Sequence, residues 1–247
     1  MKRAVILALA ALPLTACNYL GRHEDDDRPA TAREFPRPYR PVSPASTAGA
    51  SENARDDRRE AQTVMDLANI SPGMTVADIG AGEGYYTVRL ADRVGKHGRV
   101  LAEDISRLVL QDLGTRIEHD RLDNVSIKLG TEDDPKLPEN SFDRIFMVHV
   151  YHQVSEPYAL LWRMRPALRK GGQVIVVETD RPTSQQGIDP RLLFCEFSHV
   201  GYRLVEFVRK PELAGYYAQF EASGKRPEPR EIEPCLKPGD EQQVPPG

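Results

Sequence analysis

The feature that most constrains this chain is a glycine-rich turn directly after a short apolar run. The apolar run covers 75–79, the turn reads Gly-Ala-Gly-Glu-Gly over 80–84, and an amphipathic segment covers 87–94. This order predicts a buried strand, a tight loop and a helix. Glycines let the backbone adopt positive φ and approach a ligand closely, and the first N–H groups of a helix stay open to that ligand. The stretch therefore predicts a ligand-binding turn at one edge of a parallel sheet.

The spacing of the glycines argues against a dinucleotide site. That fingerprint is Gly-x-Gly-x-x-Gly, which would need a glycine at position 85. Tyr85 stands there instead, and the third glycine, Gly84, comes one residue earlier. A pyrophosphate would then meet a bulky side chain where it needs bare backbone. A nicotinamide-dependent oxidoreductase is therefore disfavoured.

The same stretch is similar to a known motif. The pattern Asp78-x-Gly80-x-Gly82-x-Gly84 resembles the first motif of class I S-adenosylmethionine-dependent methyltransferases. The resemblance implies that S-adenosylmethionine is the cofactor and that the turn holds its amino-acid end and its ribose. The residues implied for this contact are Asp78, Gly80, Ala81, Gly82 and Gly84. A turn of a parallel sheet without a ligand is the alternative.

Acidic residues after the next two expected strands extend this site. Asp104 lies 20 residues past the last glycine, where a nucleotide-binding sheet places a carboxylate for ribose hydroxyls. The alternative for Asp104 is a helix cap, although Ser106 suits that role. In many members of the family the next loop contacts adenine through an aspartate, which Thr131 replaces here. Glu132 and Asp133 are the candidates for that contact, and a solvated acidic loop is the alternative.

Strands alternating with helices, followed by a final hairpin, predict an α/β fold. We expect a Rossmann-like, seven-stranded, mostly parallel sheet with a C-terminal antiparallel hairpin and helices on both faces. The ranges expected are one helix over 54–70, a fourth strand over 144–148, a helix that ends at the glycines 171–172, a fifth strand over 173–178 and a helix over 189–199. Within the family the chain looks most like a predicted-methyltransferase branch. The loop 133–138 and the motif 150–153 carry that likeness, with Gln153 in place of an acidic residue.

The motif after the fourth expected strand supplies the candidate catalytic residues. Methyl transfer needs alignment above all, and a base if the acceptor is a hydroxyl or a protonated amine. Ligands of such sheets lie beyond the carboxyl ends of the strands. His152 is the first candidate for the base, because imidazole titrates near neutral pH, and Tyr151 and His149 are the second candidates. A packing role is the alternative for each. The spacing of His, Cys and acidic residues predicts no metal site.

The first residues predict export. Lys2 and Arg3 precede an apolar run over 4–14, which is too short for a membrane span of about 20 residues and typical of a signal peptide. The sequence Leu-Thr-Ala-Cys that ends at Cys17 resembles a bacterial lipobox, which implies cleavage before Cys17 and a diacylglycerol on its sulfur. A chance cysteine after an ordinary signal is the alternative. We therefore expect a lipoprotein anchored to a membrane and facing the periplasm.

Composition then divides the chain into four parts. We expect a signal peptide over 1–16, a disordered Pro-rich tether over 17–53, the methyltransferase domain over 54–222 and a loose tail over 223–247. The tail carries Cys235. A disulfide between Cys195 and Cys235 suits an oxidising compartment, and a buried free thiol at Cys195 is the alternative.

Two functions remain open on this basis. The first is an S-adenosylmethionine-dependent methyltransferase that acts on an unidentified acceptor, expected to be a small molecule. The second is an exported, non-catalytic module that binds S-adenosylmethionine or a nucleoside, because this cofactor is made in the cytoplasm. The formal net charge of −4, without a basic face in the composition, argues against a nucleic-acid partner.

Overall fold

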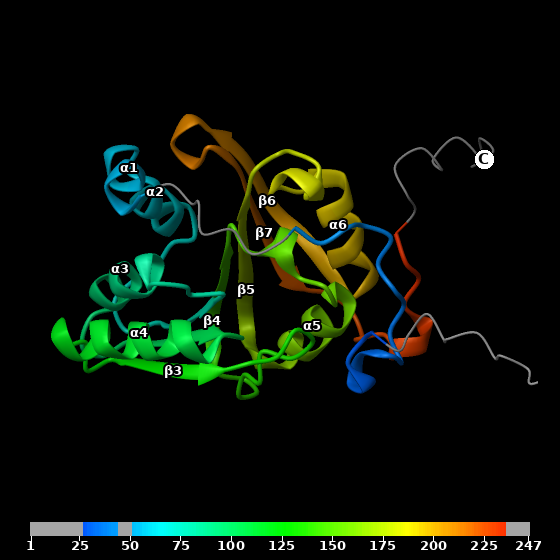
Figure 1. Ribbon diagram of the computed structural model, residues 1–247, viewed down its shortest axis with the longest axis horizontal. Helices are drawn as coiled ribbons and strands as arrows, with labels where there is room; N and C mark the ends of the chain where they lie inside the picture. The colour runs from blue at the N-terminus through cyan, green and yellow to red at the C-terminus, as the bar shows by residue number, and fades with distance from the viewer. Residues whose placement is uncertain (1–26, 44–50, 236–247) are drawn as a thin grey trace, which may run out of the picture.

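The protein is built on one seven-stranded sheet with the order β3-β2-β1-β4-β5-β7-β6 (Figure 1). The computed structural model describes residues 27–43 and 51–235, so Cys17 and the predicted signal peptide lie outside the described residues. The strands are β1 (Thr75–Ile79), β2 (Arg99–Asp104), β3 (Val125–Leu129), β4 (Phe142–Val148), β5 (Leu168–Glu178), β6 (Tyr202–Lys210) and β7 (Gly215–Ala222). Only β7 runs antiparallel to its neighbours, β5 and β6. The predicted fold class is therefore confirmed.

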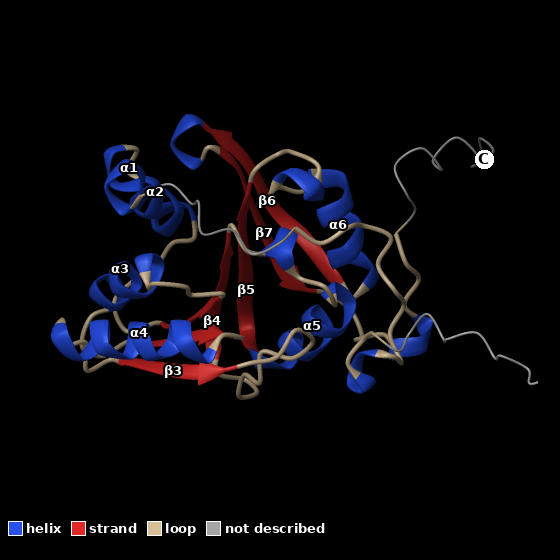
Figure 2. Ribbon diagram, in the orientation of Figure 1, coloured by secondary structure: helices blue, strands red, loops and turns tan. Residues whose placement is uncertain are grey.

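Helices cover both faces of this sheet (Figure 2). The α-helices are α1 (Glu52–Asp57), α2 (Glu60–Leu67), α3 (Tyr85–Val94), α4 (Arg107–His119), α5 (Pro157–Met164) and α6 (Pro190–His199). The short 3-10 helices are η1 (Ala30–Ala32), η2 (Tyr151–Gln153), η3 (Arg165–Ala167), η4 (Thr183–Gln185), η5 (Pro211–Leu213) and η6 (Pro229–Glu231). None of the helices in the described ranges has the length and apolar character needed to cross a membrane.

Alternate residues of the central strands divide the core into two halves. Val76 of β1 packs with α2 and α3 in one cluster, whereas Ala77 and Ile79 pack with α5 and α6 in another. Successive side chains of a strand point to opposite faces, so β1 is buried on both faces. A fully buried β1 explains its continuous apolar run, which is typical of parallel sheets.

Two expected boundaries differ from the structure. The single helix expected over 54–70 is two helices, because Arg59 adopts a left-handed φ of 57° and separates α1 from α2. The helix before the fifth strand ends at Met164 instead of the glycines 171–172, and β5 already begins at Leu168. Leu168 is buried as the first residue of β5, and a buried leucine is equally compatible with the apolar stripe of a helix, so periodicity alone did not separate the two. The helix expected over 189–199 is confirmed, with Asp189 as its N-cap.

Residues 27–43, which we expected to be part of a disordered tether, are packed against the domain. In Figure 1 this blue segment runs beside α5 and α6. Its Ala32 and Phe35 belong to the core cluster of α5 and α6. Arg28 donates to Glu156 at 2.8 and 2.6 Å, and all of these side chains are buried. The expectation failed because two apolar residues and a buried arginine hold the segment, despite its polar, Pro-rich composition. We call residues 27–43 the N-terminal strap.

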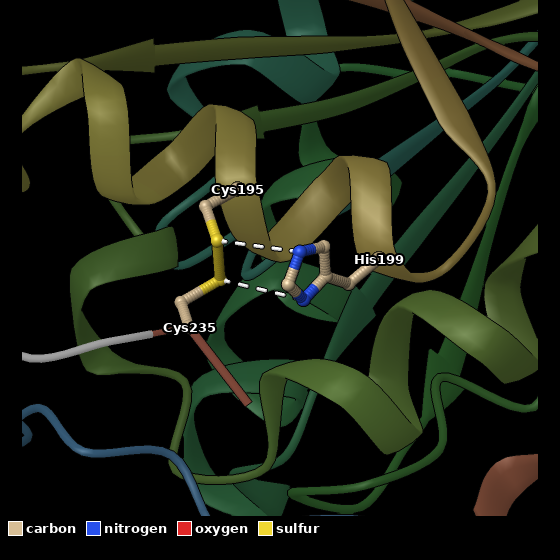
Figure 3. Close-up of side chains that lie close together, drawn as sticks. All are labelled: Cys195, His199 and Cys235. Atoms are coloured by element: carbon tan, nitrogen blue, oxygen red, sulfur yellow. Dashed lines mark hydrogen bonds between the residues drawn. A yellow bond between two sulfur atoms is a disulfide. The ribbon is translucent and has the colours of Figure 1, made fainter. Parts of the chain in front are cut away.

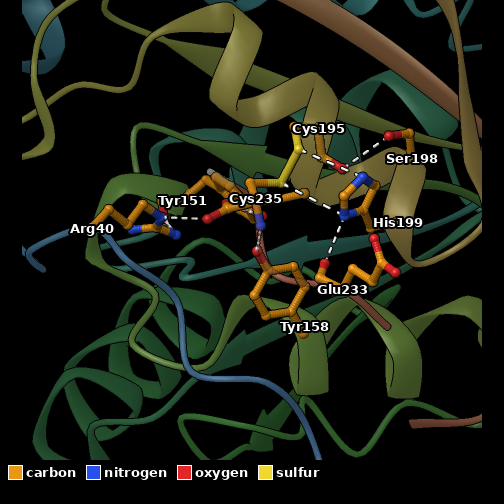
Figure 4. Close-up of a disulfide and its surroundings, with 9 residues drawn as sticks. Arg40, Tyr151, Tyr158, Cys195, Ser198, His199, Glu233 and Cys235 are labelled. Carbon is orange, nitrogen blue, oxygen red and sulfur yellow. Dashed lines mark hydrogen bonds and ion pairs between the residues drawn. A yellow bond between two sulfur atoms is a disulfide. The ribbon is translucent and has the colours of Figure 1, made fainter. Parts of the chain in front are cut away.

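The first part of the expected loose tail is also fastened. Arg165 donates to the carbonyl groups of Ser223 and Gly224, and Ile232 is buried in the core cluster of α5 and α6. A disulfide joins Cys195 of α6 to Cys235, with a Cα–Cα separation of 6.0 Å (Figure 4). The question left open by the sequence is therefore answered in favour of the bridge.

Candidate functional site

The glycine turn and Asp104 meet at the carboxyl edge of the sheet. β1 and β2 are parallel neighbours with Ile79 opposite Glu103, so the residues that follow both strands lie side by side. The Asp104 carboxylate accepts a hydrogen bond from the N–H of Gly82 at 3.2 Å and another from the N–H of Ser106 at 2.8 Å. Ser106 is the N-cap of α4, as expected. The structure therefore brings the predicted turn and the predicted ribose carboxylate together.

The three glycines of the turn have different reasons to lack a side chain. A Cβ atom on Gly80 would overlap the side chain of Val150, which follows β4, and one on Gly84 would come within 2.5 Å of Leu113 of α4. A Cβ atom on Gly82 would meet no protein atom within 4 Å, although its φ of +55° is left-handed. Gly80 and Gly84 are thus required by packing within the protein. Gly82 borders open space, which leaves room for a ligand.

Asp78 lies beneath this turn and ties β1 to α3. Its carboxylate is buried and accepts a hydrogen bond from the Thr87 hydroxyl at 2.6 Å. Burial raises the pKa of Asp78 to about 6, against the opposing effects of that hydrogen bond and of the nearby Arg55 charge. Asp78 therefore supports the turn from within the protein.

Arg55 of α1 reaches the same region and was missed by the sequence analysis. Its guanidinium lies 3.8 Å from the ring centre of Tyr85 and 2.6 Å from the carboxylate of Glu60. Nε2 of His149 lies 3.5 Å from the same carboxylate. Burial alone would raise the pKa of Glu60, but His149 and Arg55 outweigh it and lower this pKa to about 2. No local pattern marks Arg55, because its partners are brought close only by the break at Arg59.

Glu103 is a second buried acid at this edge. Its side chain lies against Gly130, where any Cβ atom would overlap the carboxylate. Burial, together with the charge of Asp104, raises the pKa of Glu103 to about 8. Two residues further on, Ile105 exposes 57% of its surface. An exposed isoleucine directly after Asp104 offers an apolar surface beside the turn.

The two acids predicted to contact adenine are engaged elsewhere. Asp133 is buried and accepts hydrogen bonds from Thr31 of the N-terminal strap at 2.6 Å and from Arg163 of α5 at 2.5 Å. Glu132 accepts a hydrogen bond from Ser155 at 3.0 Å. Within the described residues no hydrogen bond joins either acid to the glycine turn. These contacts favour a role for Asp133 in fastening the strap.

His152 forms a buried pair with Glu178. Nδ1 of His152 lies 2.9 and 3.0 Å from the two carboxylate oxygens of Glu178, which ends β5 and is fully buried. The backbone N–H of His152 donates to the same carboxylate at 3.2 Å. This partner fixes the proton on Nδ1 and leaves Nε2 as the acceptor, with the Gln153 amide nitrogen 3.3 Å away. An imidazole held by a carboxylate is the usual arrangement of a general base.

Glu178 was missed at the sequence level although a signal for it existed. The expected fifth strand ended at this residue, and β4 and β5 are parallel neighbours with Val148 opposite Val177. Residues just beyond these two positions must therefore lie close together. Pairing the residues that follow neighbouring strands would have found the contact.

The other two candidates for the base occupy different surroundings. The Tyr151 hydroxyl donates to buried Glu196 at 2.8 Å, and burial raises the pKa of Tyr151 well above its ordinary value. This environment favours a packing role for Tyr151. His149 is half-buried and has a left-handed φ of 55°, which is uncommon for a residue with a side chain. His149 therefore lies near Glu60 of α2.

A broad open groove elsewhere on the protein does not coincide with this site. It has a volume of about 1180 Å³ and lies between α2, α3 and the segment 116–124. Its lining includes neither the glycine turn nor His152. The chemical groups described above, rather than this groove, define the candidate site.

Comparison with known proteins gives a consistent result. A family model described as "Methyltransferase domain" matches residues 70–196. The demethylmenaquinone methyltransferase of Geobacillus sp. (strain WCH70) is 28% identical over 122 residues, which is 49% of this chain and 52% of that protein. The ubiquinone/menaquinone biosynthesis C-methyltransferase UbiE of Hahella chejuensis is 29% identical over 121 residues, 49% of each chain. The chain thus spans about half the length of these curated relatives.

Solved structures agree on the fold. A SAM-dependent methyltransferase from Aquifex aeolicus superposes with a TM-score of 0.60 at 22% identity, over 70% of this chain and 97% of the other. At that identity the likeness concerns the fold alone. This match covers a larger share of the chain than residues 70–196 do.

Proposed function

The chain belongs to the methyltransferase-domain family, and from that premise we propose that it transfers a methyl group from S-adenosylmethionine to a small-molecule acceptor. The observation that carries the proposal is the contact between the Asp104 carboxylate and the N–H of Gly82. It places a ribose-type carboxylate beside a glycine whose missing side chain leaves open space. A parallel-sheet turn without a ligand would not need that combination.

Different residues around the turn suit different parts of the cofactor. Asp104 suits the ribose hydroxyls, because an ionised carboxylate accepts two hydrogen bonds. Exposed Ile105 suits the flat face of adenine, and replaces Glu132 and Asp133 as our candidate for that contact. Gly82 and Ala81 suit the amino-acid end, through backbone groups at the start of α3. Arg55 and Tyr85 close this end of the site.

His152 is the proposed base. S-adenosylmethionine, when bound, supplies an electrophilic methyl group. The acceptor must lose one proton for each methyl group it gains, and Nε2 of His152 is free of a proton to receive it. Glu178 stabilises the imidazolium that results, because its carboxylate lies 2.9 Å from Nδ1. The side chain of His152 is only 5% exposed, so the base is largely shielded from bulk water.

Calorimetry and a turnover assay test this function together. We expect the purified chain to bind S-adenosylmethionine and S-adenosylhomocysteine, and not NAD. Demethylmenaquinone, which is part of the name of one curated relative, is the first acceptor to assay for release of S-adenosylhomocysteine. Replacing His152→Gln should lower kcat by about 10²- to 10⁴-fold and leave cofactor binding unchanged. Binding of NAD alone would overturn the assignment.

The outcome of that assay also separates the two functions left open by the sequence. Turnover with any acceptor supports the enzyme. Tight binding of the cofactor supports the non-catalytic binding module instead, if neither the native chain nor His152→Gln turns over any acceptor. The His152–Glu178 pair favours the enzyme, since a module that only binds has no use for a base.

We further propose that the chain is exported and anchored through a lipid on Cys17. The lipobox-like sequence before Cys17 supports the anchor. The Cys195–Cys235 disulfide independently supports export, because disulfides persist in oxidising compartments. Mass spectrometry of the protein from membranes should find a mature chain that begins with a diacylated Cys17. A chain that keeps Met1 and stays in the cytoplasmic fraction would contradict the proposal.

A further inference from the structure

Two cysteines and a histidine converge on one side of α6. Cys195 and His199 are four residues apart on this helix, a spacing that places both side chains on the same face. Cys235 approaches them from the C-terminal segment and forms the disulfide with Cys195 (Figure 3). The ligand atoms of the three residues all lie within 4.8 Å of one another. This is a set of soft and borderline donors of the kind that zinc prefers.

The hydrogen bonding of His199 prepares it to be a ligand. Nδ1 lies 2.6 Å from the carbonyl oxygen of Glu233 and therefore donates its proton to it (Figure 4). Nε2 is then unprotonated, and it lies 3.8 Å from Sγ of Cys195. Metal-binding histidines almost always donate their other ring N–H to a carbonyl or carboxylate in this way. His199 thus has the tautomer and the outer hydrogen bond of a metal ligand.

We propose that reduction of the disulfide converts Cys195, His199 and Cys235 into a zinc site. Two thiolates and one imidazole give a neutral complex with Zn²⁺, and a water completes the tetrahedron. This site stands apart from the proposed methyl transfer and does not depend on it. The spacing of the three residues did not indicate this site, because Cys235 lies 40 residues from Cys195.

The distances already approach those of such a complex. Bonds of about 2.3 Å to sulfur and 2.0–2.1 Å to nitrogen put neighbouring S and N ligands of tetrahedral zinc about 3.6 Å apart. The present separation of Sγ of Cys195 and Nε2 of His199 is 3.8 Å. The two sulfur atoms must separate to about 3.8 Å, and Sγ of Cys235, now 4.0 Å from Nδ1 of His199, must come into reach of the same metal as Nε2. Sγ of Cys195 and Nε2 of His199 are therefore already separated by about the distance that two ligands of one zinc ion require.

Contacts other than the disulfide keep Cys235 in place after reduction. Its backbone N–H donates to the Tyr158 hydroxyl at 2.8 Å, and the neighbouring Glu233 is held by His199. Cys235 is buried, whereas Cys195 and His199 are partly exposed. A reductant thus attacks from the side of Cys195, while the third ligand stays close.

The reaction balances with a dithiol as the reductant. A dithiol gives two electrons and two protons to the disulfide, which becomes two thiols, and the dithiol itself becomes a disulfide. Binding of Zn²⁺ then displaces the two thiol protons into solvent. Reoxidation by a disulfide removes two electrons from the two thiolates and reduces that disulfide to a dithiol. The S–S bond then forms, and zinc leaves because it has lost both sulfur ligands. The two cysteines can therefore either form the disulfide or bind zinc, but not both at once.

The test is a metal titration of the full chain in two redox states, with Cys17→Ser throughout to remove the third thiol. The reduced chain should bind one equivalent of Zn²⁺, and Co²⁺ should give a thiolate charge-transfer band in the near ultraviolet. The oxidised chain should bind neither metal. His199→Ala should weaken zinc binding at least tenfold, and Cys235→Ser should abolish the cobalt band.

A matched variant guards against incidental binding. His119→Ala removes an exposed histidine whose side chain contacts Asp120, so zinc affinity should stay unchanged. The circular dichroism of oxidised His199→Ala shows whether that variant keeps its fold. The proposal is overturned if the reduced chain takes up no zinc, or if folded His199→Ala and Cys235→Ser bind it as tightly as their parent.

Discussion

The two sides of the carboxyl edge are held together in different ways. Around the glycine turn, close packing on the backbone dominates. The side chains of Val150 and Leu113 pack directly against Gly80 and Gly84, and the Asp104 carboxylate accepts a hydrogen bond from the N–H of Gly82. Around η2, α5 and α6, buried charges dominate. Arg40 of the N-terminal strap lies 2.9 Å from Glu196, whose other oxygen accepts the Tyr151 hydroxyl.

The difference predicts which kind of substitution disrupts each side. A turn built from glycines fails when a side chain is added, whereas a buried ion pair fails when one partner is lost, since the remaining charge stays desolvated. We therefore expect a substitution at Gly82 to act on binding, and loss of a charge that holds the strap to act on folding. Three predictions test that division.

The largest effect is expected for Gly82→Val. A Cβ atom at this position meets no protein atom within 4 Å, so the fold should persist while the side chain fills the proposed cofactor space. Calorimetry should detect no binding of S-adenosylhomocysteine. Gly73→Val is the matched control, because Gly73 also has a left-handed φ of +87° and open space around it. Equal losses in both variants would assign the effect to backbone strain and not to the cofactor.

Glu196→Gln should destabilise the other side without touching the turn. Loss of the charge leaves buried Arg40 without its ionic partner, which costs about 3–5 kcal/mol in the free energy of unfolding. Urea unfolding followed by circular dichroism measures it. Asp180→Asn is the control, since its pair with Arg209 is about half exposed and should contribute less than about 1 kcal/mol. Similar losses in the two variants would mean that the buried pair does not fasten the strap.

Glu103→Gln should change the pH dependence of stability by a smaller amount. The pKa of Glu103 is raised to about 8 from an ordinary value of 4.5, so the folded protein keeps a proton that the unfolded chain releases. The free energy of unfolding of the native sequence therefore falls as pH rises from about 4.5 to about 8. The amide removes this slope, so it should stabilise the protein at pH 8 and leave its stability near pH 4 unchanged. Parallel pH profiles for the two proteins would contradict the assignment.

The same division explains what the sequence could predict. The sheet, the turn and Asp104 follow from local patterns, because apolar runs fix the strands and parallel strands bring their ends together. Arg28 and Arg40 find their partners 128 and 156 residues away. No periodicity records such pairs, and the Pro-rich composition around them indicated disorder. The contact of Glu178 with His152 is an intermediate case. No local pattern marks it, but the adjacency of β4 and β5 would have predicted it.

Docking of the N-terminal strap also sets the reach of the proposed lipid anchor. A tether that stayed loose from Cys17 to residue 53 could span roughly 120–130 Å when extended. With the strap fastened from residue 27 onward, only about ten residues separate the anchor from the docked chain, a span of at most about 36 Å. The strap reaches the proposed base as well, because the N–H of Ser43 donates to the carbonyl of His152. A lipid-anchored domain of this kind would work within one bilayer thickness of the membrane surface, where water-insoluble acceptors are concentrated.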